Sequence, residues 1–146
     1  MALKTCLNKK MTDKDDLIFF ALGDLDEAIS SLGLVKVIVG EKKILDKIQK
    51  DLMTISSLIA GCKVASFQFS WLAKEIKNLE KTVKIPKSFV LPGKGELEAR
   101  LHSSRTIVRR AERRLISLSR KQKIPKRLLN YLNHLSWLLF LLAVKD

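Results

Sequence analysis

Apolar residues recur at alternating three- and four-residue steps along most of this chain. That spacing places them on one face of an α-helix, and no segment of comparable length alternates as a β-strand does. The stripe of the first segment consists of Ile18, Leu22, Leu25, Ile29 and Leu32. The pattern predicts helices at about residues 13–39, 41–60, 67–82, 96–123 and 125–144. We therefore expect an all-α fold, an antiparallel five-helix bundle.

Glycine and proline separate these helices. Gly40 and Gly61 interrupt the apolar pattern, and the stretch KIPKSFVLPGKG, residues 84–95, excludes a continuous helix with its two prolines and two glycines. A chain of 146 residues fits one helical domain, residues 1–146, with a single core. Residues 1–12 precede the first helix, and we expect them to be flexible.

The positive charge of the chain is concentrated in one segment. The formal net charge is +13, and the segment from Arg100 to Arg127 holds eleven lysines or arginines and one glutamate. Such a segment favours a polyanion, an acidic membrane surface or a phosphate-bearing ligand as binding partner.

The most apolar run, Leu135 to Val144, has about half the length of a membrane span, so we expect no membrane-spanning helix. Cys6 and Cys62 fit no metal or disulfide pattern, which favours a reducing cytoplasm.

The arginines of this segment fall into two groups on a helical wheel. Arg105 and Arg109 lie beside the apolar face, next to His102 and Glu112. Arginines at the edge of a core are partly desolvated and need a carboxylate or a ligand as partner. Two interpretations stay open for them: ion pairs with acids of neighbouring helices, or a wall that binds phosphate oxygens. We expect a solvated surface for the others, Arg110, Arg113 and Arg114.

Polar residues on two other helices are candidate partners. Asp26 sits beside the apolar stripe of the first helix, so we predict a buried or half-buried ion pair between Asp26 and Arg105. Asn133 shares one face of the last helix with Trp137 and Phe140, and its amide can both donate and accept hydrogen bonds. Whether Asn133 binds a ligand or only joins two helices stays open on this pattern alone.

Several stretches of the sequence match the motifs of one enzyme family. FVLPGKGELEARLHSSRTIVRRAERRL, residues 89–115, and YLNHLSWLLFLLA, residues 131–143, resemble the ATP:cob(I)alamin adenosyltransferases of the propanediol-utilisation type. ALGDLDEAISSLG, residues 21–33, and IQKDLM, residues 48–53, resemble two further motifs of these enzymes. The similarity covers most of the chain from about Lys14 onward.

The resemblance implies a cobalamin adenosyltransferase-like bundle that assembles as a homotrimer, with active sites between adjacent subunits. It also implies a reaction in which the Co(I) centre of a corrinoid attacks the 5′ carbon of ATP and triphosphate leaves. ATP, Mg²⁺ and cobalamin would therefore be bound. Cationic donors are needed where the leaving triphosphate gathers charge, a role that arginine suits.

The same motif match assigns roles to individual residues. The catalytic residues would be Arg105, Arg109 and Asp26, with Arg105 and Asp26 paired across the site. The nucleotide would be bound by Lys14, Arg109, Glu112 and Asn133. Phe89 would press on the lower face of the corrin and exclude an axial ligand, which makes the cobalt easier to reduce. The alternative for Phe89 is an ordinary hydrophobic plug before a turn.

The sequence departs from the family pattern around the nucleotide. The family's N-terminal loop, T-G-D-x-G-x-T, wraps the triphosphate, and the segment MALKTCLNKKMTD has no glycine to form it. Lys14, Lys9 and Lys10 supply charge there, but they do not form a cradle. Polar residues of the family site are also replaced by apolar or weaker ones, at Phe20, Ile29, His134 and Trp137.

Three functions remain open on the sequence alone. The first is a divergent corrinoid adenosyltransferase with a shortened N-terminus. The second is a degenerate relative that keeps the trimer and binds corrinoid or nucleotide without efficient transfer. The third is a basic helical module that binds nucleic acid, which the motif match disfavours because no helix-turn-helix or aromatic platform is visible.

Overall fold

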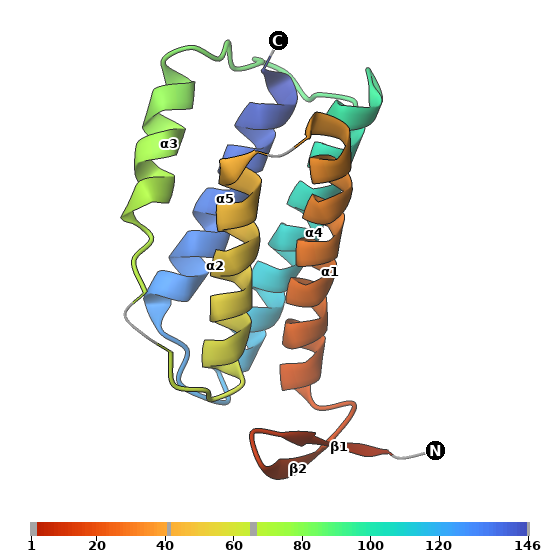
Figure 1. The fold of residues 1–146 in the computed structure, drawn as a ribbon, viewed down its shortest axis with the longest axis vertical. Helices are drawn as coiled ribbons and strands as arrows, with labels where there is room; N and C mark the ends of the chain where they lie inside the picture. Colours follow the sequence, from red (N-terminus) through yellow and green to blue (C-terminus); the bar gives the residue numbers. More distant parts are fainter. Residues whose placement is uncertain (1–2, 41, 65–66, 146) are drawn as a thin grey trace.

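The structure is a computed structural model, and it describes residues 3–40, 42–64 and 67–145. The helices found in these residues are α1 (Leu17–Val39), α2 (Lys43–Ile59), α3 (Ser70–Glu80), α4 (Glu96–Ser119) and α5 (Lys126–Val144). α4 packs between α1 and α5 and runs opposite to both, while α2 packs on α1 and α3 on α5 (Figure 1). The predicted five-helix bundle is confirmed.

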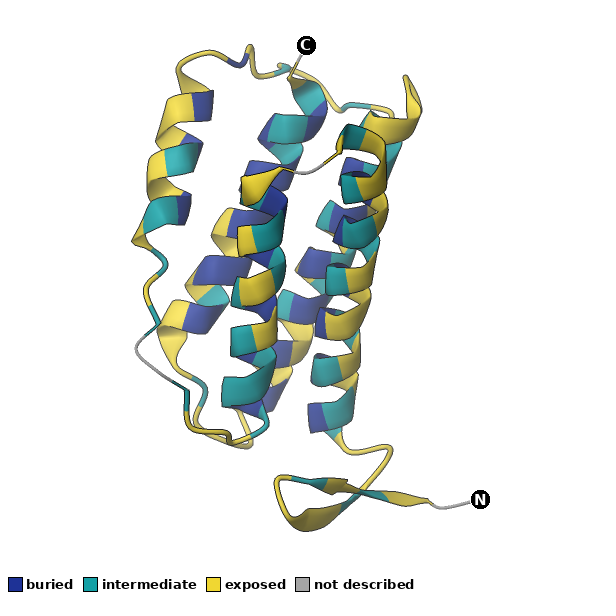
Figure 2. Cartoon of the chain, in the orientation of Figure 1, coloured by how far each residue is buried: buried dark blue, intermediate teal, exposed yellow. Residues whose placement is uncertain are grey.

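The predicted apolar stripes form the core. The buried faces of the helices turn toward one another, and their outer faces are exposed (Figure 2). α4 contributes Leu101, Val108, Ala111 and Leu115, the residues beside which the wheel places Arg105 and Arg109. Burial of an apolar side chain of this size stabilises the fold by about 1.5–3 kcal/mol, so the orientation of α4 is strongly fixed. This orientation decides which polar residues of α4 reach a cleft.

The N-terminal segment differs from our expectation of a flexible residue range 1–12. Strands β1 (Lys4–Leu7) and β2 (Lys10–Asp13) form an antiparallel hairpin. Its turn residues Asn8 and Lys9 have φ values of 46° and 66°, as a tight two-residue hairpin turn requires. The Asn8 side-chain amide also donates to the Gly61 carbonyl, at 3.0 Å, which holds the turn against the end of α2. Residues 1 and 2 lie outside the described residues.

The observed helix ends differ from the predicted ones for local reasons. α1 begins at Leu17 rather than at Asp13, because β2 occupies residues 10–13 and the Asp16 side chain caps the helix by accepting from the Ile18 amide, at 2.9 Å. α4 ends at Ser119 rather than at residue 123, since the turn toward Pro125 begins there. Glu41, the predicted start of the second helix, lies outside the described residues.

A shared carboxylate joins three of the helices. Asp51 on α2 accepts hydrogen bonds from Trp71 Nε1 on α3, at 2.8 Å, and from the Tyr131 hydroxyl on α5, at 3.0 Å. Burial raises the pKa of the Asp51 carboxyl above its ordinary value, while the two hydrogen bonds act in the opposite direction. This contact and the buried apolar residues Leu72, Ile76 and Leu79 hold α3 against the bundle.

None of the helices in the described part of the chain is both long enough and apolar enough to cross a membrane.

Candidate active site

A cleft of about 670 Å³ lies where the loop before α4 passes over the outer edge of the α4–α5 pair. We call it the arginine cleft. The loop lines it with Pro86, Lys87, Ser88, Phe89 and Val90, α4 with His102, Arg105 and Arg109, and α5 with Asn133, Ser136, Trp137 and Phe140. The structure thus brings together four of the predicted site residues, Phe89, Arg105, Arg109 and Asn133.

The helical period of α4 places the cationic residues of the cleft on one side. Arg105 and Arg109 are one turn apart, and His102 lies one turn before Arg105, so the three form a row along the helix. The buried stripe of α4 faces α1 and α5, and this row follows its edge. His102 is buried and Arg105 half-buried, as the wheel predicts for residues at the edge of the core, whereas Arg109 is exposed.

Arg105 lies at the wall of the cleft. Its guanidinium lies over the ring of Phe140, 5.9 Å from the ring centroid. Its Nε atom is buried and has no hydrogen-bond partner among the described residues. Burial lowers the pKa of Arg105, and the charge of Arg109 lowers it further. An anion in the cleft would relieve both effects, because it would supply acceptors and opposite charge.

Arg109 and Asn133 lie on facing helices beside Glu112. Arg109 is exposed and forms no ion pair with any side chain in the described ranges. Asn133 Nδ2 donates to Glu112 Oε1 at 3.3 Å, across the α4–α5 contact. Asn133 therefore joins two helices and also lines the cleft, so the two interpretations of this residue are compatible.

Phe89 projects from the loop at the rim of the arginine cleft. Its side chain is fully exposed, which contradicts the alternative of a hydrophobic plug within one chain. The following turn depends on Gly93, whose φ of 123° lies in the region that favours glycine. Glu98 on α4 closes this turn, since its Oε2 accepts from the amides of Gly93, at 2.8 Å, and Lys94, at 3.1 Å. These hydrogen bonds, that of Gly93 foremost, lower the pKa of Glu98.

Two predicted site residues lie away from the arginine cleft. Asp26 is exposed on the outer face of α1, and within one chain it forms no ion pair with Arg105. The predicted buried pair is therefore wrong as a contact inside the chain, because Asp26 points away from α4. Lys14 follows the hairpin and is exposed, and it does not line the cleft.

Two arginines of the second group, Arg110 and Arg114, are paired rather than simply solvated, a correction to our expectation, whereas Arg113 is exposed as expected. Arg110 Nε lies 2.9 Å from Asp24 Oδ1, and the same guanidinium pairs with Glu27, both on α1. Arg114 lies 3.6 Å from Asp24 and over the ring of Phe20, at 5.1 Å. These contacts neutralise much of the charge on this side of α4, which disfavours a nucleic-acid surface.

The structure also gives roles to residues that the sequence analysis did not assign to the site. Trp137 stacks on Phe140, with ring centroids 5.2 Å apart, and donates to Glu80 on α3, at 2.8 Å. His102 is 3% exposed and lines the cleft. The place of His102 beside Arg105 on the wheel was a signal for it, whereas nothing in the sequence indicated the contact between Trp137 and Glu80.

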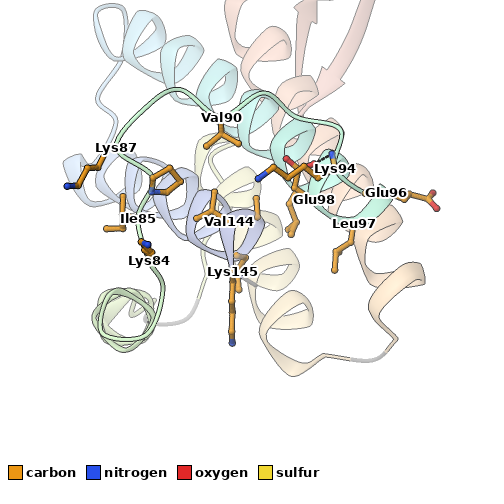
Figure 3. Close-up of a pocket in the computed structure, with 15 residues that line it drawn as sticks. Lys84, Ile85, Lys87, Val90, Lys94, Glu96, Leu97, Glu98, Val144 and Lys145 are labelled. Carbon is orange, nitrogen blue, oxygen red and sulfur yellow. Dashed lines mark hydrogen bonds between the residues drawn. The ribbon is translucent and has the colours of Figure 1, made fainter.

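A larger pocket of about 900 Å³, the end pocket, opens on the other side of the same loop (Figure 3). Its walls are mainly apolar, from Val90, Leu97 and Val144, and lysines stand around its mouth. It contains neither Arg105 nor Arg109, and its nearest acids are already engaged, since Glu98 holds the loop and Glu96 pairs with Arg100 at 2.7 Å. The predicted site residues therefore identify the smaller cleft as the candidate.

Comparison with known proteins adds independent evidence. The sequence model of the cobalamin adenosyltransferase family matches residues 4–145, so the match begins earlier than Lys14, where we placed the start of the resemblance. The chain is 31% identical to a corrinoid adenosyltransferase of Bacillus subtilis over 138 residues, 86% of this chain and 72% of that protein. It is 33% identical to the human corrinoid adenosyltransferase over 147 residues, 89% of this chain and 59% of that protein.

Solved structures agree with the family match. A variant of the PduO-type adenosyltransferase from Lactobacillus reuteri, complexed with ATP, has a TM-score of 0.84 and 30% identity, covering 97% of this chain and 87% of that one. A second variant of that enzyme, complexed with cobalamin and ATP, has a TM-score of 0.83 over 97% of this chain and 84% of that one, with 30% identity. By sequence model, relatives and fold, the chain belongs to the cobalamin adenosyltransferase family.

Proposed function

We propose that this chain transfers the 5′-deoxyadenosyl group of ATP to the Co(I) centre of a corrinoid and releases triphosphate. Its membership of the family supports this activity, as do the relatives named corrinoid adenosyltransferases and the similar structures that hold ATP and cobalamin. The observation that carries the proposal is the pair Arg105 and Arg109, which face one cleft without a carboxylate partner among the described residues. ATP supplies the missing anion.

Arg109 binds the phosphate oxygens. It is exposed at the cleft, and its planar set of donors matches those oxygens. As the bond to the 5′ carbon breaks, charge grows on the leaving triphosphate, and a fixed arginine stabilises that charge without needing to reorient. Glu112 and Asn133, already joined by a hydrogen bond, hold the nucleoside beside it. The chain thus positions ATP and stabilises its leaving group, and it transfers no proton.

Phe89 contacts the corrinoid. An exposed phenyl ring at the rim of a cleft loses its unfavourable contact with water when a large flat ligand covers it. The ring then occupies the lower axial side of the cobalt, where a water or a base would otherwise coordinate. Reduction to Co(I) becomes easier, because that oxidation state does not retain the axial ligand.

The site is completed between subunits of a homotrimer. The outward face of α1 exposes Leu34 and Val37 on the same side as the carboxylate of Asp26, and the partly buried Phe19 and Leu22 border it. A largely apolar face on the outside of a bundle requires cover, and Val37 is 84% exposed within one chain. In the trimer, Asp26 of one subunit meets Arg105 of the next, and both charges gain the partner that they lack within the chain.

The N-terminal hairpin contributes lysines to the nucleotide. Lys9, Lys10 and Lys14 are exposed on or beside the hairpin, and they supply positive charge without forming the cradle of the family's glycine-rich loop. Lys14 binds the phosphates of ATP in the site of a neighbouring subunit.

Mg²⁺ enters as MgATP, since it prefers phosphate oxygens with one or two carboxylates, and the described residues contain no group of three potential metal ligands. The chain acts in the cytoplasm, where reducing conditions keep exposed thiols such as those of Cys6 and Cys62 free.

The test is a reaction of the purified chain with chemically reduced cobalamin and MgATP. We expect adenosylcobalamin to form, with one triphosphate released for each. Titration of ATP and of corrinoid without the reductant separates the proposal from its alternative. Binding of either ligand with no adenosylcobalamin formed identifies a degenerate relative, and the proposed activity is then refuted.

A further inference from the structure

Glu98 connects the loop that carries Phe89 to helix α4. Its Oε2 accepts from the backbone amides of Gly93 and Lys94, at 2.8 and 3.1 Å, so one oxygen of the carboxylate closes the turn. Phe89 lies just before this turn in the chain. The position of Glu98 therefore decides where the loop leaves α4.

The other oxygen of Glu98 faces His102. Glu98 Oε1 lies 3.2 Å from His102 Nε2, one helical turn further along α4. The atoms are close enough to interact but are not aligned as a hydrogen bond, and both count among the buried polar atoms without a hydrogen-bond partner in the described residues. His102 Nδ1 is in the same situation. A polar ring that is 3% exposed and forms no hydrogen bond with the described residues lowers the stability of the fold, so we ask which function it serves.

His102 also touches the arginine cleft. It lines the cleft beside Arg105, and its ring centroid lies 6.1 Å from that of Phe140, the ring that also carries the Arg105 guanidinium. His102 thus stands between the carboxylate that closes the Phe89 loop and the wall that holds Arg105.

We propose that His102 is a positioning residue, which fixes Glu98 and through it sets the Phe89 loop relative to Arg105. The consequence for the corrinoid rests on the proposed function, whereas the consequence for the loop does not. The His102 ring, with Nε2 3.2 Å from Glu98 Oε1, packs against the carboxylate and keeps it directed at the Gly93 and Lys94 amides. Without that polar contact, Glu98 is free to rotate, and the turn loosens.

The charge state of His102 follows from its surroundings. On α4 it faces Glu98 and Arg105, with Arg109 further along the cleft, and on the loop it faces Lys87. The cleft residues of α5, by contrast, are uncharged. Burial lowers the pKa of His102, Glu98 raises it, and Arg105 lowers it. The balance favours the neutral ring at neutral pH.

The first experiment measures solvent exchange of the Gly93 and Lys94 amides by NMR. In His102→Leu we expect exchange about 3- to 10-fold faster than in the wild type, the effect of losing one polar contact to Glu98. His102→Gln, whose amide nitrogen reaches the place of Nε2, keeps exchange slow, while the shorter His102→Asn does not. Equal exchange in all four proteins, or equal behaviour of the Gln and Asn variants, overturns the inference.

The control distinguishes positioning from general loosening. Ser104→Ala removes another buried polar group of α4 that has no hydrogen bond among the described residues, and it leaves the Phe89 loop untouched. We expect unchanged exchange at Gly93 and Lys94 in Ser104→Ala, and unchanged exchange at the core amides of Val108 and Leu132 in every variant. Faster exchange at those core amides in His102→Leu means that the ring only supports the fold, which also overturns the inference.

The second experiment measures adenosyl transfer with reduced cobalamin. We expect His102→Leu to raise the KM for the corrinoid about tenfold and to leave the KM for ATP unchanged, because only the loop has moved. An equal rise in both KM values contradicts the inference. If the wild type itself transfers nothing, the proposed function fails, and the amide-exchange result still decides the role of His102.

Discussion

The guanidinium of Arg105 lies over the ring of Phe140, 5.9 Å from its centroid, in the contact between α4 and α5. The Nε atom of the same side chain is buried and has no hydrogen-bond partner among the described residues. Within a single chain, Arg105 thus already lies at the wall of the arginine cleft. Preorganised donors of this kind are what stabilisation of a developing charge requires.

The first prediction tests the proposed homotrimer and the proposed contact between Asp26 and Arg105 of adjacent subunits. Asp26→Arg and Arg105→Asp each place like charges together at that contact, so each variant is expected to shift the trimer toward monomers at micromolar concentration. The double variant restores the opposite charges and is expected to recover part of the trimer. Sedimentation velocity measures the populations.

A control for the charge swap is Asp15→Arg, which alters an exposed acid before α1 by the same charge. We expect it to leave the trimer unchanged. A double variant no more trimeric than either single variant would show that Asp26 and Arg105 do not meet.

The second prediction concerns the arginines on the α1 side of α4. Arg110→Ala removes the ion pairs with Asp24 and Glu27, and it should lower the free energy of unfolding by about 0.5–1 kcal/mol, because Arg110 is partly exposed and solvent weakens the pairs. Adenosyl transfer should continue at the wild-type rate. Arg113→Ala, an exposed arginine of the same helix, is the matched control and should change neither quantity. A loss of transfer in Arg110→Ala would place this side of α4 in the site.

The third prediction is a dependence of stability on pH. The pKa of His102 lies below 6.5 in the folded chain, so the unfolded chain binds the proton more readily. The contribution of His102 to stability is complete above pH 6.5 and is lost as the pH falls through the lowered folded pKa. In His102→Gln, thermal melting between pH 7.5 and about 5 should depend less on pH than in the wild type.

The second histidine of the chain provides the comparison. His134 is exposed on α5, so His134→Gln should keep the pH dependence of the wild type. The assignment to His102 fails if the His134 variant loses that dependence and the His102 variant retains it.

The fourth prediction concerns the anchoring of α3. Asp51→Ala leaves the Trp71 indole and the Tyr131 hydroxyl without their acceptor, and an unsatisfied buried donor costs about 1–3 kcal/mol. We expect a loss of about 2–4 kcal/mol in the free energy of unfolding, measured by urea titration. The control is Asp46→Ala, which also alters an acid of α2 and removes its half-exposed ion pair with Lys36 of α1. It should lower the free energy of unfolding by less than about 1 kcal/mol. Equal losses would show that the hydrogen bonds to Asp51 contribute nothing of their own.

The fold was predictable from the sequence because helical periodicity reports burial directly. Residues such as Val108 and Leu115 are spaced for one face, and that face is the core. The hairpin was not predictable in the same way, since its strands have four residues each and its turn contains Asn8 and Lys9 rather than glycine. Its position depends on the contact of Asn8 with Gly61, which lies far along the chain.

The candidate site was predictable as a row on one helix, but its partners were not. The wheel places Arg105 and Arg109 beside the core because that position depends on α4 alone. The direction in which Asp26 points depends on how α1 rotates against α4, and the wheel of one helix does not contain that rotation. The ion pairs of Arg110 with acids of α1 were not predictable for the same reason, because they also depend on how α1 is rotated against α4.

The most direct test of the account compares the wild type with Arg109→Ala in a single turnover with reduced cobalamin and saturating MgATP. Loss of one donor to a developing charge lowers such rates by about 10²–10³. We predict a loss of that size in the formation of adenosylcobalamin, with the α-helical circular dichroism unchanged. A wild-type rate in the folded Arg109→Ala variant would contradict the claim that the arginine cleft stabilises the leaving triphosphate.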